Sequence, residues 1–248
     1  HTGLAYPEIV EHVKRTPNTI MVKPEKTFKE VIAQYGYPVI SKRVAQYIHD
    51  VQASRGETAT KHLRLTGYKG DGTYSKMGKI PDCYQHLIYA PFKISDRCCH
   101  WLKKKPAKKA HDKLGLYPYL GTRTDESDQR TQTYYVYGCN AYDMKMPRST
   151  PIAFLLDQDV REYIHAYNIP YASVYDMGYT RTGCMFCMFG VHLEDVPNRF
   201  QMMHKTHPKI WNYCMDNLGI QRVLDYIGVP STLQQQFWPG LAPVPFNK

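Results

Sequence analysis

Apolar and polar positions alternate with a helical period in several separate segments near the start of the chain. Residues 6–15 (YPEIVEHVKR) are amphipathic, and Pro7 suits the first turn of a helix. Residues 27–35 end before Gly36, and residues 41–51 begin with a serine that can cap a helix. The pattern therefore predicts one helix in each of these three segments.

Further helices are predicted in the centre and toward the C-terminal end. Asp96 can cap a helix over about residues 97–111, and Asp157 can cap a helix over residues 157–167 (DQDVREYIHAY). Residues 195–228 carry enough apolar periodicity for two or three more helices.

Short β-prone runs and polar loops separate the predicted helices. Residues 19–22 (TIMV) and 116–121 (LYPYLG) are predicted strands, and residues 66–80, rich in Gly and Lys, predict a mobile surface loop. The last residues are Pro-rich and are expected to be ragged. Short strands that alternate with helices predict an α/β fold, with a parallel sheet flanked by helices and a helical C-terminal extension.

The composition is that of a globular chain. The 248 residues suffice for one large domain or two small ones, and 43% are apolar while 22% are charged. No run of 18 apolar residues occurs, so no membrane-spanning helix is expected. The N-terminal residues lack the basic-then-apolar order of a secretory leader, so we expect a cytoplasmic protein without a membrane partner.

The charge balance is basic. Lys and Arg number 32 against 22 Asp and Glu, which gives a formal net charge of +10. This excess favours an anionic partner such as a nucleotide, a nucleic acid or a sulfated metabolite. A solvated basic surface without such a partner is the alternative.

The chain contains seven cysteines, and four of them form two tight pairs. Cys98 and Cys99 are adjacent, and two residues lie between Cys184 and Cys187. The two pairs are separated by 84 residues. An odd count without a secretory leader disfavours a disulfide framework and favours metal binding or catalysis in a reducing compartment.

Four thiolates suit either a tetrahedral zinc ion or an iron–sulfur cluster. Adjacent cysteines reach separate iron atoms more easily than they converge on one small ion, so the spacing favours a 4Fe–4S cluster. Zinc and inert buried thiols remain alternatives. A redox dithiol is disfavoured, because the two residues between Cys184 and Cys187 offer no means of lowering a thiol pKa.

The cysteine pattern resembles the cluster motif of the sulfonucleotide reductases, the adenylyl-sulfate branch of the APS/PAPS reductase family. Six segments of the chain, spread over about residues 1–190, resemble motifs of that family and follow in its order. They are HTGLAYPE at 1–8, CCHWLK at 98–103, GTRTDESDQR at 121–130, residues 151–164 with DVREYI, NIPY at 168–171 and GY at 178–179.

The resemblance implies an adenine-nucleotide alpha-hydrolase fold, a parallel sheet with the nucleotide at the carboxyl ends of its strands. The family's Ser-Gly-Gly-x-Asp-Ser phosphate loop is absent, so the first β–loop–α unit is expected to be missing from this sequence, by truncation rather than by loss. It further implies a reductase-like domain with an iron–sulfur site over residues 1–190. Residues 191–248 would form a helical extension with a Pro-rich tail.

The resemblance also implies a bound adenine nucleotide: ATP, adenylyl sulfate (APS) or its 3′-phosphorylated form (PAPS). The candidate anion contacts are Thr2, Gly3, Arg123 and Arg130, with Lys103 as a weaker candidate. Guanidinium groups present a rigid fork of donors to phosphate or sulfate oxygens. Alternatively, the two arginines pair with the carboxylates of their own segment.

No catalytic residue is identified. The family attacks sulfur with a cysteine in a C-terminal Glu-Cys-Gly-x-His segment, where x is hydrophobic, and this chain has no such segment. Cys214, on an apolar helical stripe, is predicted to be a buried structural thiol, and Cys83 and Cys139 belong to no motif.

Three functions follow from these observations. The first is an iron–sulfur oxidoreductase of sulfur metabolism that acts on an adenine sulfonucleotide. The second is a sulfur-transfer enzyme with ATP pyrophosphatase chemistry that modifies DNA or tRNA, which the basic charge favours. The third is a non-catalytic binding module stabilised by a cluster. The electron donor, a partner protein and a homo-oligomeric state are left open.

Overall fold

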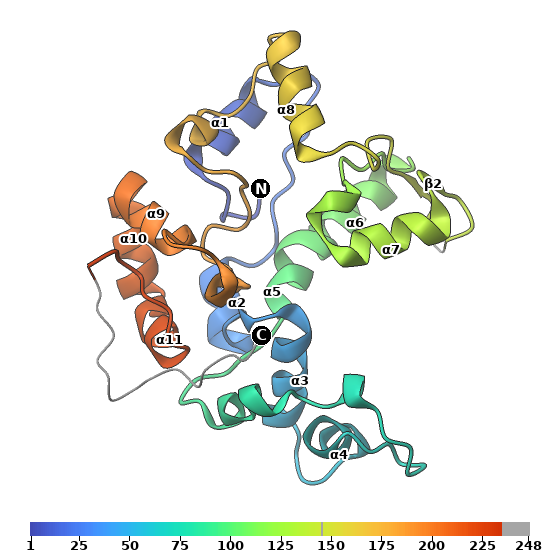
Figure 1. Ribbon diagram of the computed structural model, residues 1–248, viewed down its shortest axis with the longest axis vertical. Coiled ribbons are helices and arrows are strands. Elements are labelled where there is room, and N and C mark those ends of the chain that lie inside the picture. Colours follow the sequence, from blue (N-terminus) through green and yellow to red (C-terminus); the bar gives the residue numbers. More distant parts are fainter. Residues whose placement is uncertain (145, 235–248) are drawn as a thin grey trace. The chain divides into compact units, whose positions relative to one another are not determined.

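The computed structural model describes residues 1–144 and 146–234, which form mainly helices and helical turns (Figure 1). Two compact units make up the chain. Unit 1 consists of His1–Val10, Ile20–Pro106 and the described residues from Val174 onward, and unit 2 consists of Glu11–Thr19 and Ala107–Ser173. The predicted domain boundary after residue 190 stays a prediction, and the Pro-rich tail lies outside the described residues.

The three helices predicted near the start are confirmed as α1 Pro7–Arg15, α2 Phe28–Tyr35 and α3 Lys42–Gln52. The hydroxyl of Thr27 accepts a hydrogen bond from the Glu30 amide while the Glu30 carboxylate accepts from the Thr27 amide, a capping box that fixes the start of α2. The Ser41 side chain caps α3 in the same way, by accepting from the amide of Val44.

A short parallel sheet lies in unit 1, where β1 Val39–Ile40 pairs with β4 Met188–Phe189. In unit 2, β2 Asn140–Ala141 pairs antiparallel with β3 Arg148–Ser149. The expectation of a parallel sheet flanked by helices is therefore correct in kind and wrong in extent, because the described chain is mostly helical.

The two predicted strands are not formed. Residues 19–22 have no strand structure, and within residues 116–121 only Tyr119 makes an isolated bridge, to Ser149. Ile20 is 68% exposed and Tyr119 is 80% exposed. A β-prone run forms a strand when it can pair and bury one face, and neither run does so here.

Residues 97–114 form one helical run, as predicted, but with a different geometry. It consists of α5 Arg97–Cys99, a π-helical turn at His100–Lys104 and α6 Lys105–Leu114. The expected cap is wrong, because the Asp96 side chain makes no capping hydrogen bond.

The helix predicted over residues 157–167 is α8 Asp157–Ala166, and its cap also differs. Asp157 is the first helical residue and not the cap. The amide of Leu156 instead donates to the carboxylate of Asp159, which leaves the Asp157 carboxylate available to arginines.

The core of unit 1 includes the predicted C-terminal helices, which are α9 Arg199–Thr206, α10 Pro208–Asn212 and α11 Ile220–Tyr226, lying side by side in Figure 1. Phe200 on α9 and Leu224 on α11 are fully buried. A π-helical turn at Tyr213–Asn217 connects α10 to α11.

Unit 2 has a much smaller apolar interior. Its helices are α6, α7 Asp128–Tyr137 and α8, and none of these has a buried residue. The buried apolar residues described in this unit are three alanines: Ala141, Ala153 and Ala172.

The remaining helical elements are short. They are α4 Ala59–Thr66 and the 3₁₀ segments Lys76–Gly78, Asp82–Tyr89, Thr124–Glu126, Ser173–Met177 and Val191–Leu193. Over the described ranges, no helix is both long and apolar enough to cross a membrane.

Candidate functional site

Two segments of unit 1 position the four paired cysteines. Cys98 and Cys99 lie in α5, at the start of the helical run, where the hydroxyl of the buried Ser95 accepts a hydrogen bond from the amide of Arg97. Cys184 and Cys187 lie in a turn that is closed by a 3.0 Å hydrogen bond from the Cys187 amide to the Cys184 carbonyl. This turn leads directly into β4.

The four thiols interact with one another. The pKa of Cys98 is raised, and the largest cause is its hydrogen bond to Cys99. Burial and the nearby charges of Cys99, Cys187 and Cys184 raise it further. That same hydrogen bond lowers the pKa of Cys99 to about 6. The two adjacent thiols are thus hydrogen-bonded to each other, and the second pair lies close enough to influence their pKa values.

The second pair is held mainly in the thiol form by its surroundings. Burial raises the pKa of Cys184, against the opposing charge and hydrogen bond of Lys103. Burial also raises the pKa of Cys187 to about 11, although Arg199 opposes the shift. A bound cation would shift both groups toward the thiolate form.

Two cations lie beside the thiols. Burial alone would lower the pKa of Lys103. The charge of Cys184, a hydrogen bond to Cys184 and the charges of Cys99 and Cys187 outweigh burial, so the net effect is a raised pKa. Arg199 donates to the Cys187 carbonyl at 2.8 Å and is paired with Glu194. The positive charges of Lys103 and Arg199 favour the thiolate forms of the second cysteine pair, against the effect of burial.

The donor set fits an iron–sulfur cluster in its chemistry, because iron–sulfur clusters are held by cysteine thiolates. Across residues 1–144 and 146–234, no three His, Cys, Asp or Glu side chains are arranged to bind one metal ion. The ligands of a single zinc ion converge on one point, whereas cysteines that bind separate iron atoms stand farther apart. Cluster binding therefore stays a prediction.

The Thr2–Gly3 turn lies in unit 1 and is connected to the cysteine turn. The Thr2 hydroxyl accepts a hydrogen bond from the Leu4 amide at 3.1 Å, and Gly3 has a φ of +73°. The carbonyl of the buried Leu4 then accepts from the Met185 amide at 2.9 Å. The structure thus brings Thr2, Gly3 and the cysteine turn into one part of unit 1.

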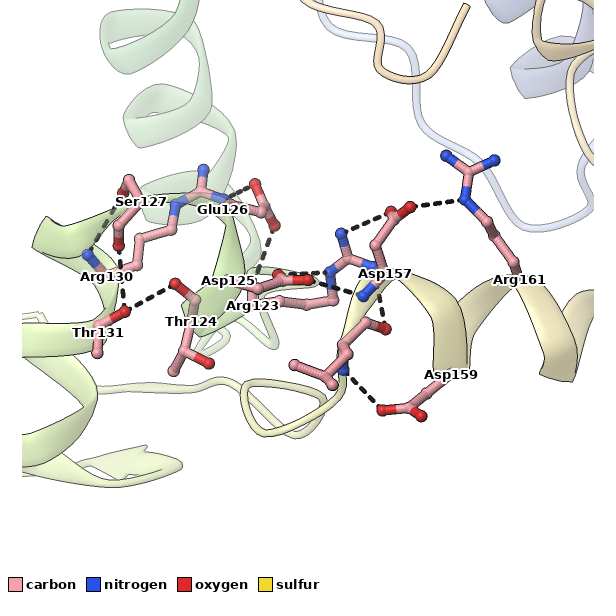
Figure 2. A network of polar contacts seen from close by, with 11 residues as sticks. Arg123, Thr124, Asp125, Glu126, Ser127, Arg130, Thr131, Asp157, Asp159 and Arg161 are labelled. Atoms are coloured by element: carbon pink, nitrogen blue, oxygen red, sulfur yellow. Dashed lines mark hydrogen bonds and ion pairs between the residues drawn. The ribbon is translucent and has the colours of Figure 1, made fainter.

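Arg123 and Arg130 lie in unit 2, and both pair with carboxylates (Figure 2). Arg123 contacts Asp125 at 3.3 Å and Asp157 at 3.0 Å, while Arg130 pairs with Glu126. Local ion pairing, the alternative for these arginines, is therefore present in the structure.

The five candidate anion contacts thus fall into two groups. Thr2, Gly3 and Lys103 belong to unit 1, and Arg123 and Arg130 belong to unit 2. The shared anion site stays a prediction.

Cys214 is fully buried on the π-helical turn, as predicted, and burial raises the pKa of its thiol. A buried thiol of raised pKa is a poor nucleophile. Cys83 is exposed and Cys139 is half-buried.

A partly buried polar network in unit 1 was not predicted from the sequence. His207 Nε2 lies 3.2 Å from both carboxylate oxygens of Glu8, and its Nδ1 lies 2.8 Å from the hydroxyl of Thr206, which in turn contacts the Tyr179 hydroxyl at 2.8 Å. The network fastens the start of α1 to the end of α9. Glu8 and Tyr179 belong to recognised motifs, but no sequence signal indicates a partner 199 residues away.

Comparison with known proteins supports the resemblance. The sequence model of the phosphoadenosine phosphosulfate reductase domain matches residues 6–189. An adenosine 5′-phosphosulfate reductase of Oceanobacillus iheyensis is 30% identical over 92 residues, which are 37% of this chain and 37% of that protein. The chain therefore aligns with little more than a third of this relative's length, and no solved structure matches it. Neither finding favours the nucleic-acid-modifying or the non-catalytic alternative.

Proposed function

The chain belongs to the phosphoadenosine phosphosulfate reductase domain family, and from this premise we propose that it acts on an adenine sulfonucleotide in the reductive part of sulfur metabolism. Adenylyl sulfate is the favoured substrate, because the curated relative is named for adenosine 5′-phosphosulfate. Its 3′-phosphorylated form is the second candidate.

The observation that carries this proposal is that both cysteine segments pack against α2. α5, which holds Cys98 and Cys99, contacts α2, and Phe186, between Cys184 and Cys187, lies 6.1 Å from Phe28 of α2 by ring centres. Thiols that come from segments 84 residues apart need a reason to gather beside a cation. A 4Fe–4S cluster held by the four thiolates supplies one. When bound, such a cluster provides a centre whose charge and potential depend on the surrounding hydrogen bonds.

In this proposal the residues around the thiols have separate tasks. Lys103 and Arg199 offset the negative charge of the thiolates. Lys103 is exposed enough to contact a substrate anion as well. Thr2 and Gly3 would contact the nucleotide next to the cysteine turn, since Leu4 links the two segments.

Arg123 and Arg130 would bind the substrate's phosphate or sulfate oxygens by exchanging their present carboxylate partners. For Arg130, whose side chain is 42% exposed, the exchange gives up an ion pair worth on the order of 0–1 kcal/mol. Arg123 is only 14% exposed, so its pairs are less screened by water.

The proposed function is tested by calorimetric titration of anaerobically purified protein with adenylyl sulfate. We expect saturable binding that Lys103→Ala weakens about tenfold, which corresponds to about 1.4 kcal/mol. Lys108→Ala is the matched control, because Lys108 lies on the same helical run, pairs with Asp112 and should leave the affinity unchanged. Equal affinities for the wild type and Lys103→Ala would remove Lys103 from the site, and absence of binding would contradict the proposed substrate.

A further inference from the structure

A hollow lies in unit 1, and none of the four paired cysteines lines it. It has a volume of about 390 Å³ and lies between α2, the segment at residues 92–93 and the start of the C-terminal helix α11. Its lining includes Arg222, which lies beyond the residues matched by the family. None of the residues assigned to the proposed function lines the hollow.

The floor of the hollow is apolar and firmly held. Ile32, Phe92 and Leu218 are buried in it, and Tyr37 contacts Phe92 edge-on at a ring-centre distance of 5.8 Å. The Tyr37 hydroxyl donates to the Leu218 carbonyl at 2.8 Å, which joins the C-terminal helices to the N-terminal part of the floor.

The backbone of residues 36–37 packs tightly against that of Lys93 beneath the floor. The Tyr37 amide donates to the Lys93 carbonyl at 2.8 Å, and a Cβ at Gly36 would lie only 2.3 Å from that same carbonyl group. Gly36 also has a φ of +108°, which favours glycine. The floor is thus built before any ligand arrives, which reduces the entropy lost on binding.

The rim of the hollow carries three cations and no acid. Lys29, Lys93 and Arg222 line it, and within the part of the chain that the structure describes none of them pairs with a carboxylate. The Tyr37 hydroxyl accepts a hydrogen bond from Arg222 Nη2 at 3.2 Å, which orients the guanidinium and leaves its other donors available.

Another hollow in unit 1, of about 250 Å³, shows by contrast a mixed lining. It includes Lys42, Arg97 and Lys104 but also Asp50 and Asp96, so its cations have acids nearby. Of these two hollows, the larger one has the acid-free rim and would attract a multiply charged anion more strongly.

We propose that the hollow between α2 and α11 binds a phosphate monoester with a small apolar or aromatic body. Three cations suit a phosphate monoester, which carries about −1.5 to −2 charges near pH 7, better than a carboxylate. The guanidinium of Arg222 can bind two phosphate oxygens at once. A volume of about 390 Å³ lies within the range of organic-ligand pockets, roughly 300–1,000 Å³, so an organic body fits against the apolar floor.

Phenyl phosphate is the probe, because it has both parts of the proposed ligand and contains no adenine that could occupy the nucleotide site. The full chain is titrated with it by calorimetry at low ionic strength, alongside inorganic phosphate and phenol. We expect phenyl phosphate to bind at least tenfold more tightly than either. Equal or weaker binding than inorganic phosphate would overturn the role of the apolar floor.

Variants locate the binding site. Arg222→Gln and Lys93→Gln should each raise the Kd of phenyl phosphate about tenfold, and because both side chains are exposed either variant should fold. Lys205→Gln, an exposed cation on α9 outside the hollow, is the matched control and should leave the Kd unchanged. Binding that both hollow variants leave unaltered, or no saturable binding at millimolar concentrations, would overturn the proposal. Neither result would bear on adenylyl sulfate.

Discussion

Different interactions stabilise the interior of unit 1 and the interior of unit 2. Unit 1 buries large side chains such as Phe200, Met188 and Ile48 completely. Unit 2 buries only alanines among its described apolar residues, and leaves aromatic side chains such as Tyr135 exposed at its surface. Its prominent contacts are instead ion pairs centred on Arg123 and Asp157 (Figure 2).

This difference separates two kinds of candidate chemistry. The thiols need fixed positions and protection from water, and they lie in the unit with the apolar core. The arginines lie where contacts are polar and easily exchanged, which suits groups that must change partners on binding an anion. We therefore expect the loss of a buried apolar side chain to destabilise unit 1 strongly, and the loss of Arg123 or Arg130 in unit 2 to act mainly on binding.

The largest effect is expected from the core of unit 1. Phe200→Ala removes a fully buried ring and should lower the free energy of unfolding by about 3–5 kcal/mol, because it leaves a cavity. Tyr135→Ala in unit 2 is the control; its side chain is 75% exposed and the change should stay within about 0.5 kcal/mol. Urea denaturation measures both, and similar losses would contradict the contrast between the units.

The next effect concerns binding by unit 2. Arg123→Ala should weaken adenine-nucleotide binding by about 1.5–3 kcal/mol, the contribution of a charge-assisted hydrogen bond. Arg161→Ala removes a cation that also pairs with Asp157 but belongs to no candidate site, and should have little effect on affinity. Calorimetric titration of both variants with adenylyl sulfate is the measurement. An unchanged affinity for Arg123→Ala would show that its ion pairs are only structural.

A smaller effect is expected from acid. Hydrogen bonds from Arg161 and Arg123 lower the pKa of Asp157 below its ordinary value. A carboxyl group with a lowered folded-state pKa stabilises the fold above its unfolded pKa, about 3.9, and loses that contribution as the pH falls through the folded value. The Asp157 side chain is 53% exposed, so the loss should not exceed about 1 kcal/mol.

Asp157→Asn should therefore flatten the acid dependence of hydrogen exchange in α8 below about pH 4. Asp143→Asn, elsewhere in unit 2, is the comparison. An acid dependence that survives Asp157→Asn would mean that other carboxylates stabilise this helix.

The smallest effect is expected on sulfur chemistry. Covalent attack needs an accessible nucleophile close to its target, and the thiol of Cys214 is fully buried with a raised pKa. We expect no sulfite from adenylyl sulfate and thioredoxin with this chain alone, and none with Cys214→Ser. Sulfite release that Cys214→Ser abolishes would contradict this, and release that survives the substitution would identify an external thiol as the nucleophile.

Local sequence signals predicted the helices of this protein better than its strands. Ser41 forms the expected cap, and Thr27, expected as the first helical residue, caps α2 through a nearby amide. Both helix starts are thus fixed by neighbours in sequence. The pairing of β1 with β4 joins residues almost 150 positions apart, and no local pattern encodes that register. The run at residues 19–22 has β-propensity but no partner strand, so its propensity has no effect.

The candidate site could be predicted where the spacing of cysteines along the sequence indicates metal or cluster binding. The adjacent cysteines and the C-x-x-C pair predicted a site of four thiols. In the structure the two pairs lie close enough for the C-x-x-C pair to affect the pKa of Cys98. Arg199 was missed because its role depends on the Cys187 carbonyl and on Glu194, which are brought together by a turn. Surface ion pairs such as that of Arg123 and Asp157 likewise depend on tertiary contacts that a motif does not describe.

The central claim is that Cys98, Cys99, Cys184 and Cys187 together bind one 4Fe–4S cluster. Iron, sulfide and zinc are measured in anaerobically purified protein and in Cys187→Ser, with Cys83→Ser as the control for an exposed cysteine of no motif. The account predicts brown protein with about four irons and four sulfides per chain, lost in Cys187→Ser and kept in Cys83→Ser. Colourless protein that contains one zinc per chain would contradict it.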